Sequence, residues 1–87
     1  MEENNLEQFR EYSKTIKMTP VMSSNISAIG YDEQHKLLKV IFKGNSSYLY
    51  NNVEPQIWAI LSNAESKGST LTECVTKHKD KYKYIKL

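Results

Sequence analysis

The chain has one cysteine, two prolines and three glycines among its 87 residues. The single cysteine, Cys74, excludes an internal disulfide and predicts a reducing, cytoplasmic setting. The longest uninterrupted apolar run, Ile57–Leu61, is far shorter than the ~20 residues that span a bilayer. The residues Met1-Glu2-Glu3 carry the wrong charge for a secretory signal. The sequence therefore predicts neither a disulfide scaffold nor a membrane protein.

Residue clusters that carry catalysis or bind metal are also lacking. The three glycines of the chain are isolated from one another, so no glycine-rich loop is available to hold a phosphate. Cys74 and His78 are spaced to share one helix face, as a nucleophile pair or half a metal site. However, zinc needs three or four ligands, and the only other histidine is His35 in a distant loop. We therefore expect a non-enzyme with no catalytic residue, no metal and no cofactor.

What the sequence does have is an uneven distribution of charge. Residues 1–35 carry three cations and six anions, whereas residues 36–87 carry nine lysines and four anions. The formal net charge of +2 hides this asymmetry. A basic half with tyrosines between its lysines suits contact with a polyanion, and the alternative is an ordinary solvated surface.

The N-terminal segment 5–17 has the apolar spacing of an amphipathic helix, with Leu6, Phe9, Ser13 and Ile16 on one face. Asn4 is its predicted N-cap, and Thr19-Pro20 ends it. This helix is expected to pack on the second face of a sheet. The alternative is an arm that joins copies of the chain or docks a partner.

The middle of the chain predicts three strands, at residues 26–31, 38–43 and 47–50. Two short connections, one of them the tight-turn pair Gly44-Asn45, indicate an antiparallel meander. A helix is expected at 55–64, followed by a break at Ser66-Lys67-Gly68. A short helix then opens at Thr70 with the buried stripe Leu71, Cys74, Val75 and His78, and the tail 79–87 has the spacing of an extended segment. The predicted fold is α+β, with an N-terminal helix, a three-stranded antiparallel β-meander and two C-terminal helices packed on the sheet.

Several motifs then follow one another in a specific order. They are Ser23-Ser24-Asn25-Ile26, Ala28-Ile29-Gly30-Tyr31-Asp32, the pair Tyr48-x-Tyr50 with Val53 and Pro55 behind it, and the Ser66-Lys67-Gly68 break. In these, the segment 23–87 resembles the KTSC domain, a module named after the C-terminus of some lysyl-tRNA synthetases and also found alone in short bacterial and phage-related proteins. The resemblance divides the chain into a helical extension, 1–20, and a KTSC-like domain, 21–87. It implies RNA binding as a suggested role.

The chain departs from the family pattern at two places. Thr70-Leu71-Thr72 stands where the family usually has an aromatic segment. The family's C-terminal arginines are lysines here, and lysine keeps the charge but lacks the flat two-pronged fork of arginine.

We interpret the chain as a small binding module whose ligand is nucleic acid, RNA first. Tyrosines would stack bases while lysines neutralise phosphates; alternatively, Tyr48 and Tyr50 only complete the core. The alternative function is a protein-interaction or inhibitor module, of phage or mobile-element origin, that acts on a host protein. No membrane partner is expected, and the oligomeric state is a monomer or a weak homo-oligomer through the N-terminal helix. The candidate binding residues are Lys39, Lys43, Tyr48, Tyr50, Lys77, Lys79, Lys81, Tyr82 and Lys83.

Overall fold

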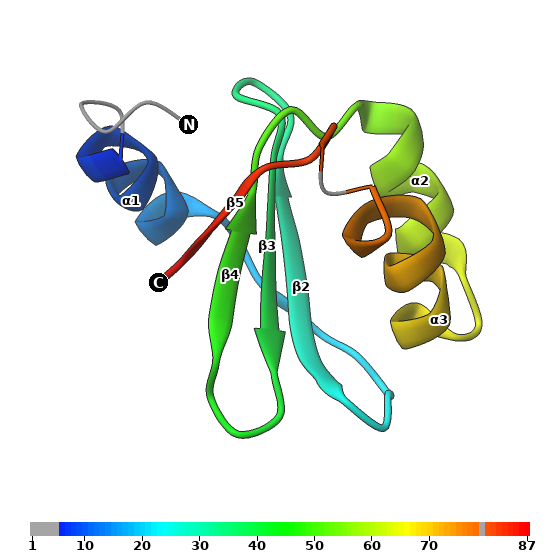
Figure 1. Cartoon of the computed structure of the whole chain (residues 1–87). Helices are drawn as coiled ribbons and strands as arrows, with labels where there is room; N and C mark the ends of the chain where they lie inside the picture. Colours follow the sequence, from blue (N-terminus) through cyan, green and yellow to red (C-terminus); the bar gives the residue numbers. More distant parts are fainter. Residues whose placement is uncertain (1–5, 79) are drawn as a thin grey trace.

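The fold is a five-stranded antiparallel sheet with helices on both faces (Figure 1). The computed structural model describes residues 6–78 and 80–87. The strands follow one another in sequence order across the sheet: β1 (Thr19–Pro20), β2 (Ile26–Asp32), β3 (Leu37–Phe42), β4 (Ser47–Tyr50) and β5 (Tyr84–Lys86). The helices are α1 (Leu6–Thr15), α2 (Pro55–Asn63) and α3 (Lys67–Leu71), the last continuing as a π-helical segment, Thr72–Thr76.

The α+β class is confirmed, but the prediction of three strands is wrong. Thr19 and Pro20 pair with Ile29 and Ala28 and form an edge strand. Proline has no backbone N–H to donate, and an edge strand tolerates it because only one of its sides is hydrogen-bonded to the sheet. The tail is extended and pairs with β4, which makes it the opposite edge strand. Both additions depend on contacts between segments far apart in the chain, which local periodicity does not reveal.

One face of the sheet carries the larger core, beneath α2 and α3. The alternation predicted for β3 turns Leu38 and Val40 toward this face, and both are fully buried. They join apolar side chains from both helices and from the tail; the buried members are Ile26, Ile29, Leu38, Val40, Tyr50, Val53, Leu61, Leu71, Val75 and Tyr82. This core determines which surface of the sheet stays open near β4 and β5.

The opposite face carries a smaller core beneath α1. Its buried members are Ile16, Leu37 and Leu49. Phe9 of α1 packs against them, so the N-terminal helix lies on the second face of its own sheet, as expected. The helix is shorter than the predicted 5–17, and its predicted cap Asn4 lies outside the described residues.

The C-terminal helical region differs from its prediction in two ways. Helix α3 begins at Lys67, and the Thr70 amide donates to the Ser66 carbonyl at 3.0 Å, so Thr70 is inside the helix and does not cap it. Gly68 serves close packing, since a Cβ there would lie 2.5 Å from Asn25 Oδ1. The π-helical segment ends at Thr76, so His78 lies beyond the helix and is exposed, and its predicted place in the buried stripe is wrong.

Candidate nucleic-acid interface

Strand register brings tyrosines and a lysine from two distant segments onto one face of the sheet. Tyr48 of β4 lies opposite Lys86 of β5, and Tyr50 lies opposite Tyr84. Directly opposed residues of antiparallel strands project their side chains to the same face. All four side chains therefore belong to the face that α2 and α3 partly cover.

Four aromatic rings form a continuous series on this face. The ring centroids of Phe42 and Tyr48 are 5.5 Å apart, those of Tyr48 and Tyr84 are 5.5 Å apart, and those of Tyr84 and Tyr50 are 5.8 Å apart. The first two pairs meet edge to face, a favoured geometry for aromatic rings. They line a groove of about 180 Å³, and we call it the aromatic groove: Phe42, Tyr48, Tyr50, Thr76, Tyr82 and Tyr84.

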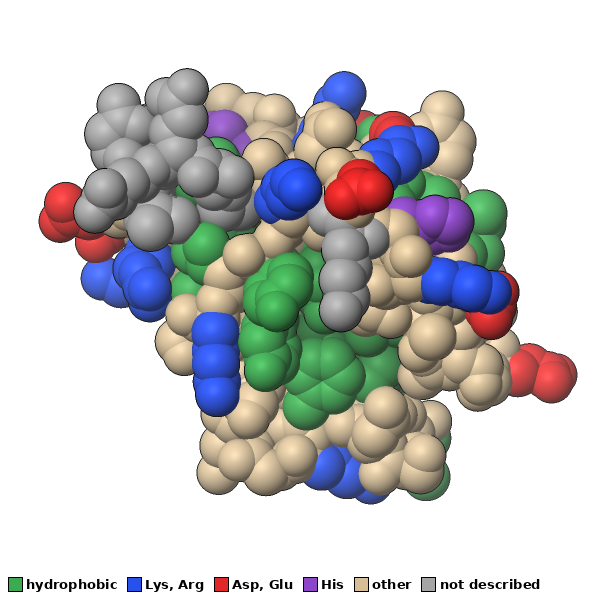
Figure 2. All heavy atoms as spheres, viewed as in Figure 1, with side chains coloured by type: hydrophobic (Ala, Val, Ile, Leu, Met, Phe, Trp, Pro, Cys, Tyr) green, Lys and Arg blue, Asp and Glu red, His purple; other side chains and the backbone are tan. Residues whose placement is uncertain are grey.

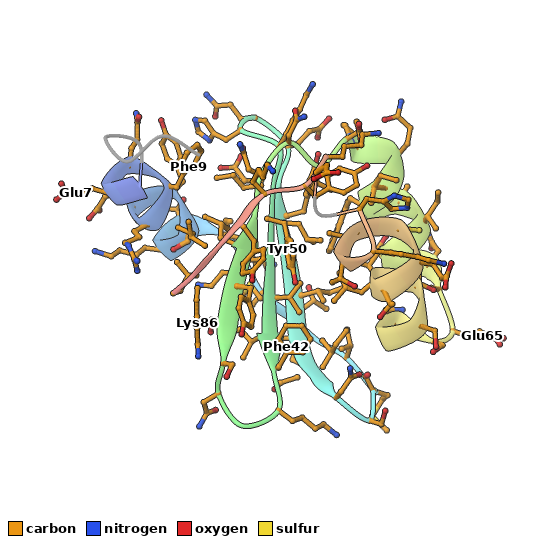
Figure 3. All side chains as sticks on the ribbon, in the orientation of Figure 1. Glu7, Phe9, Phe42, Tyr50, Glu65 and Lys86 are labelled. Atoms are coloured by element: carbon orange, nitrogen blue, oxygen red, sulfur yellow. The ribbon has the colours of Figure 1, made fainter. Side chains whose placement is uncertain are left out.

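Figure 2 shows an apolar patch at the centre of this face with blue side chains around it. In Figure 3, Phe42 and Tyr50 lie within the same region, and Lys86 lies beside it along β4. The groove therefore combines an aromatic floor with one lysine, Lys86, beside it.

The tyrosines of the groove differ in exposure. The Tyr84 side chain is 51% exposed and Tyr48 is half-buried, so both offer ring surface to a ligand. Tyr50 is only 5% exposed, and burial, aided by Tyr48 and Tyr84, raises its pKa to about 12. The two interpretations of the Tyr48-x-Tyr50 pair, ligand contact and core residue, therefore each apply to one of the two tyrosines. Tyr50 belongs to the core, whereas Tyr48 lies at the groove surface.

Tyr82 is a core residue, which overturns its prediction as a base-stacking side chain. Its ring is 3% exposed, and its hydroxyl donates to Glu54 Oε2 at 2.8 Å. Burial and the Glu54 carboxylate raise the pKa of this hydroxyl. Lys81 Nζ lies 3.1 Å from Glu54 Oε1, and the Glu54 hydrogen bond and charge raise the pKa of Lys81. These contacts tie the start of the tail to the beginning of α2.

The predicted lysines do not form one surface. Lys39 lies on the α1 face, where its Nζ donates to the Ser13 carbonyl at 3.2 Å, so its prediction as part of the tyrosine surface is wrong. Lys77 lies 3.4 Å from Glu73 Oε2, and Lys79 lies outside the described residues. Lys43 and Lys83 are exposed.

The candidate binding residues chosen from the sequence omit three side chains of this surface: Phe42, Tyr84 and Lys86. Tyr84 and Lys86 repeat the two-residue spacing of Tyr48 and Tyr50, which is the signal of a shared strand face. That signal becomes useful only when the tail is paired with β4, because pairing decides which tyrosines are neighbours.

Cys74 and His78, the other pair considered from the sequence, line one pocket together with Glu73 and Lys81. Cys74 is half-buried, and His78 Nε2 lies 3.0 Å from the Glu73 carbonyl oxygen. Within residues 6–78 and 80–87, no three His, Cys, Asp or Glu side chains are grouped so that they could hold a metal ion. None of the helices in that described part has the length and apolar character needed to cross a membrane.

The fold and the groove define the class of this protein as a small α+β module with an aromatic surface at the edge of an antiparallel sheet. Residues 22–84 match the model of the KTSC domain, and the chain belongs to that family. It is similar to a KTSC domain protein from Yersinia pestis, whose crystal structure superposes with a TM-score of 0.75 at 29% identity and covers 84% of this chain and 99% of that one.

Two relatives are similar in sequence over more than half of the chain. A protein from Tsukamurella paurometabola is 45% identical over 51 residues, which are 59% of this chain and 76% of the relative. An uncharacterized protein from Stutzerimonas stutzeri is 32% identical over 53 residues, which are 61% of this chain and 75% of the relative. The family match includes Phe42, Tyr48 and Tyr84, but it ends before Lys86 and begins after α1.

Proposed function

We propose that the chain is a non-enzymatic module that binds single-stranded nucleic acid, RNA first, in the aromatic groove. The observation that carries this proposal is the exposed ring of Tyr84, next to Tyr48 and on the same strand face as Lys86. The proposed binding unit is a monomer, and the packing of α1 on the sheet of its own chain supports this. A reducing, cytoplasmic location belongs to the same proposal.

The mechanism combines stacking with charge neutralisation. A base that stacks on an aromatic side chain contributes about 1–3 kcal/mol. A groove of about 180 Å³ admits one unpaired base, whereas a paired base has both faces covered by its neighbours in the duplex. Lys86, which shares a strand face with Tyr48 and Tyr84, would meet the phosphate beside that base, and the exposed Lys43 and Lys83, which adjoin Phe42 and Tyr84 in the sequence, would meet phosphates further along the strand. Single strands should therefore bind more tightly than duplexes of the same sequence.

Fluorescence anisotropy with labelled single- and double-stranded RNA and DNA tests the proposal. Three phosphate contacts give a log–log salt slope of roughly −2 for a single strand, so the affinity should fall roughly fifteenfold between about 50 and 200 mM salt. Tyr84→Ala should weaken binding by about tenfold through lost stacking. Lys86→Glu should weaken binding to every sequence and flatten the salt slope by about one.

Lys36→Glu is the matched control, because it makes the same charge change at an exposed position in the turn between β2 and β3. Equal losses of affinity in Lys36→Glu and Lys86→Glu would show that binding depends only on the net charge of the protein. Absence of binding at the lowest salt would refute the nucleic-acid proposal. That result would favour the protein-interaction alternative, whose surface is the apolar groove lined by Pro20, Val21, Met22 and Trp58.

A further inference from the structure

The N-terminal helix and the C-terminal strand share one core. Phe9 and Tyr12 of α1 pack against the cluster Ile16, Leu37 and Leu49, and so do Ile85 of β5 and the terminal Leu87. Helix α1 and the residues after Tyr84 therefore pack on the same core, on the face of the sheet that lies behind the aromatic groove. Figure 1 shows the C-terminus ending close to α1.

Strand β5 divides its side chains between the two faces. Ile85 is paired with Leu49 and packs into the smaller core, whereas Tyr84 and Lys86 face the aromatic groove. β5 is three residues long and is the edge of the sheet, bonded to β4 on one side. Such a short edge strand gains much of its stability from the apolar contacts of its covered side. The position of Tyr84 and Lys86 thus depends on what holds Ile85.

Helix α1 is fixed to a different part of the sheet. The Tyr12 ring stacks on His35, with 3.7 Å between centroids and 13° between planes. Lys39 Nζ of β3 donates to the Ser13 carbonyl at 3.2 Å. Both contacts anchor α1 to the β2–β3 hairpin, so the apolar side of the helix is held against the core that supports β5.

We propose that α1 clamps β5 from behind and thereby positions Tyr84 and Lys86 in the aromatic groove. Neither α1 nor residues 85–87 fall within the family match, so the two terminal segments of this chain build part of its groove together. Phe9 and Ile85 are positioning residues that act through Tyr84 and Lys86. The link to ligand affinity rests on the proposed function, whereas the clamp itself does not.

Amide hydrogen exchange in the full-length protein tests the clamp directly. The Leu87 amide donates to the Ser47 carbonyl at 2.8 Å, so its exchange rate reports the opening of β5. Phe9→Ala should speed Leu87 exchange by about tenfold and leave the Val40 amide of the central strand unchanged. Phe9→Leu should restore most of the protection. The matched control is Glu7→Ala, since in Figure 3 Glu7 points away from the sheet and Phe9 points toward it.

Binding of a labelled single-stranded RNA provides the second readout. Phe9→Ala should weaken it by about fivefold, at the lower end of couplings between separate sites, and should lose this effect in a Tyr84→Ala/Lys86→Ala background. Unchanged Leu87 exchange in Phe9→Ala, or acceleration at Leu87 and Val40 alike, would overturn the clamp. Additive losses in the double-mutant cycle would overturn the positioning role. If the unmodified protein binds no oligonucleotide, the proposed function fails, and Leu87 exchange still decides the clamp.

Discussion

Replacing Tyr82 by phenylalanine separates a core role from a ligand role at this position. The change removes one hydroxyl and leaves the buried ring in place, so it deletes the hydrogen bond from Tyr82 to Glu54 Oε2. A hydrogen bond to a charged group contributes about 1.5–3 kcal/mol, and we take the lower end because Glu54 is half-exposed and keeps its contact with Lys81. For a domain of this size, about 1.5 kcal/mol corresponds to a fall in Tm of roughly 6–12 °C.

The destabilisation should depend on pH in a direction set by Glu54. A hydrogen bond from its own backbone amide, then those from Tyr82 and Lys81, lower the pKa of this carboxyl in the folded protein. Its contribution to stability is therefore complete above the pKa of an unfolded-chain glutamate, about 4.3, and is lost as the pH falls through the lower native pKa. The difference between the unmodified protein and Tyr82→Phe should shrink below about pH 4.

Urea unfolding of both proteins at pH 7 and pH 3 measures this difference, with Tyr84→Phe as a control that removes the same atom from a half-exposed ring. Equal stabilities at pH 7, or a difference that persists undiminished at pH 3, would contradict the assigned hydrogen bond. Oligonucleotide affinity should not change in Tyr82→Phe. A marked loss of affinity without loss of stability would restore Tyr82 as a ligand contact.

Two further perturbations test the packing of the sheet and the β2–β3 turn. Gly30→Ala should lower the free energy of unfolding by about 1–3 kcal/mol in a urea titration, because its Cβ would lie 2.6 Å from the Lys17 carbonyl oxygen. The control Gly44→Ala, at φ +97° in open space, should lower it by only about 1 kcal/mol. A larger loss of stability in Gly44→Ala than in Gly30→Ala would refute the packing argument. Asp32→Asn should lower the free energy of unfolding by about 1 kcal/mol at pH 7. Burial works to raise the pKa of Asp32, but hydrogen bonds from His35 lower it on balance. The stabilisation by the carboxylate is therefore present above about pH 4 and is lost as the pH falls through the native pKa. A cost that is as large at pH 2 as at pH 7 would contradict the role of the carboxylate.

Much of the fold was predictable because it follows from local rules. The alternation in β3, the proline at the first position of α2 and the apolar face of α1 are each visible in a short window of sequence. The turn between β3 and β4 was predictable for the same reason. Gly44 and Asn45 adopt φ values of 97° and 70°, which these two residue types tolerate best.

The candidate site was predictable only in part. The Tyr48-x-Tyr50 spacing places both rings on one face whatever surrounds them, and the structure agrees. Tyr82 and Lys39 were assigned to the surface by residue type, and both are held by partners distant in sequence, Glu54 and Ser13. The position of Lys86 beside the tyrosines is not visible from local spacing, because its neighbour Tyr48 belongs to another strand.

The sequence by itself determined the class, the family and the principal elements, because periodicity and turn chemistry act over a few residues. Tertiary structure alone decided that the tail becomes β5, that Tyr84 and Lys86 border the groove, and that α1 supports them from behind. The scarcity of cysteine bears on this division. No disulfide marks which segments are neighbours, so the packing of α1 and β5 on one core rests on apolar contacts around Leu49. Packing of that kind leaves no local signature in the sequence.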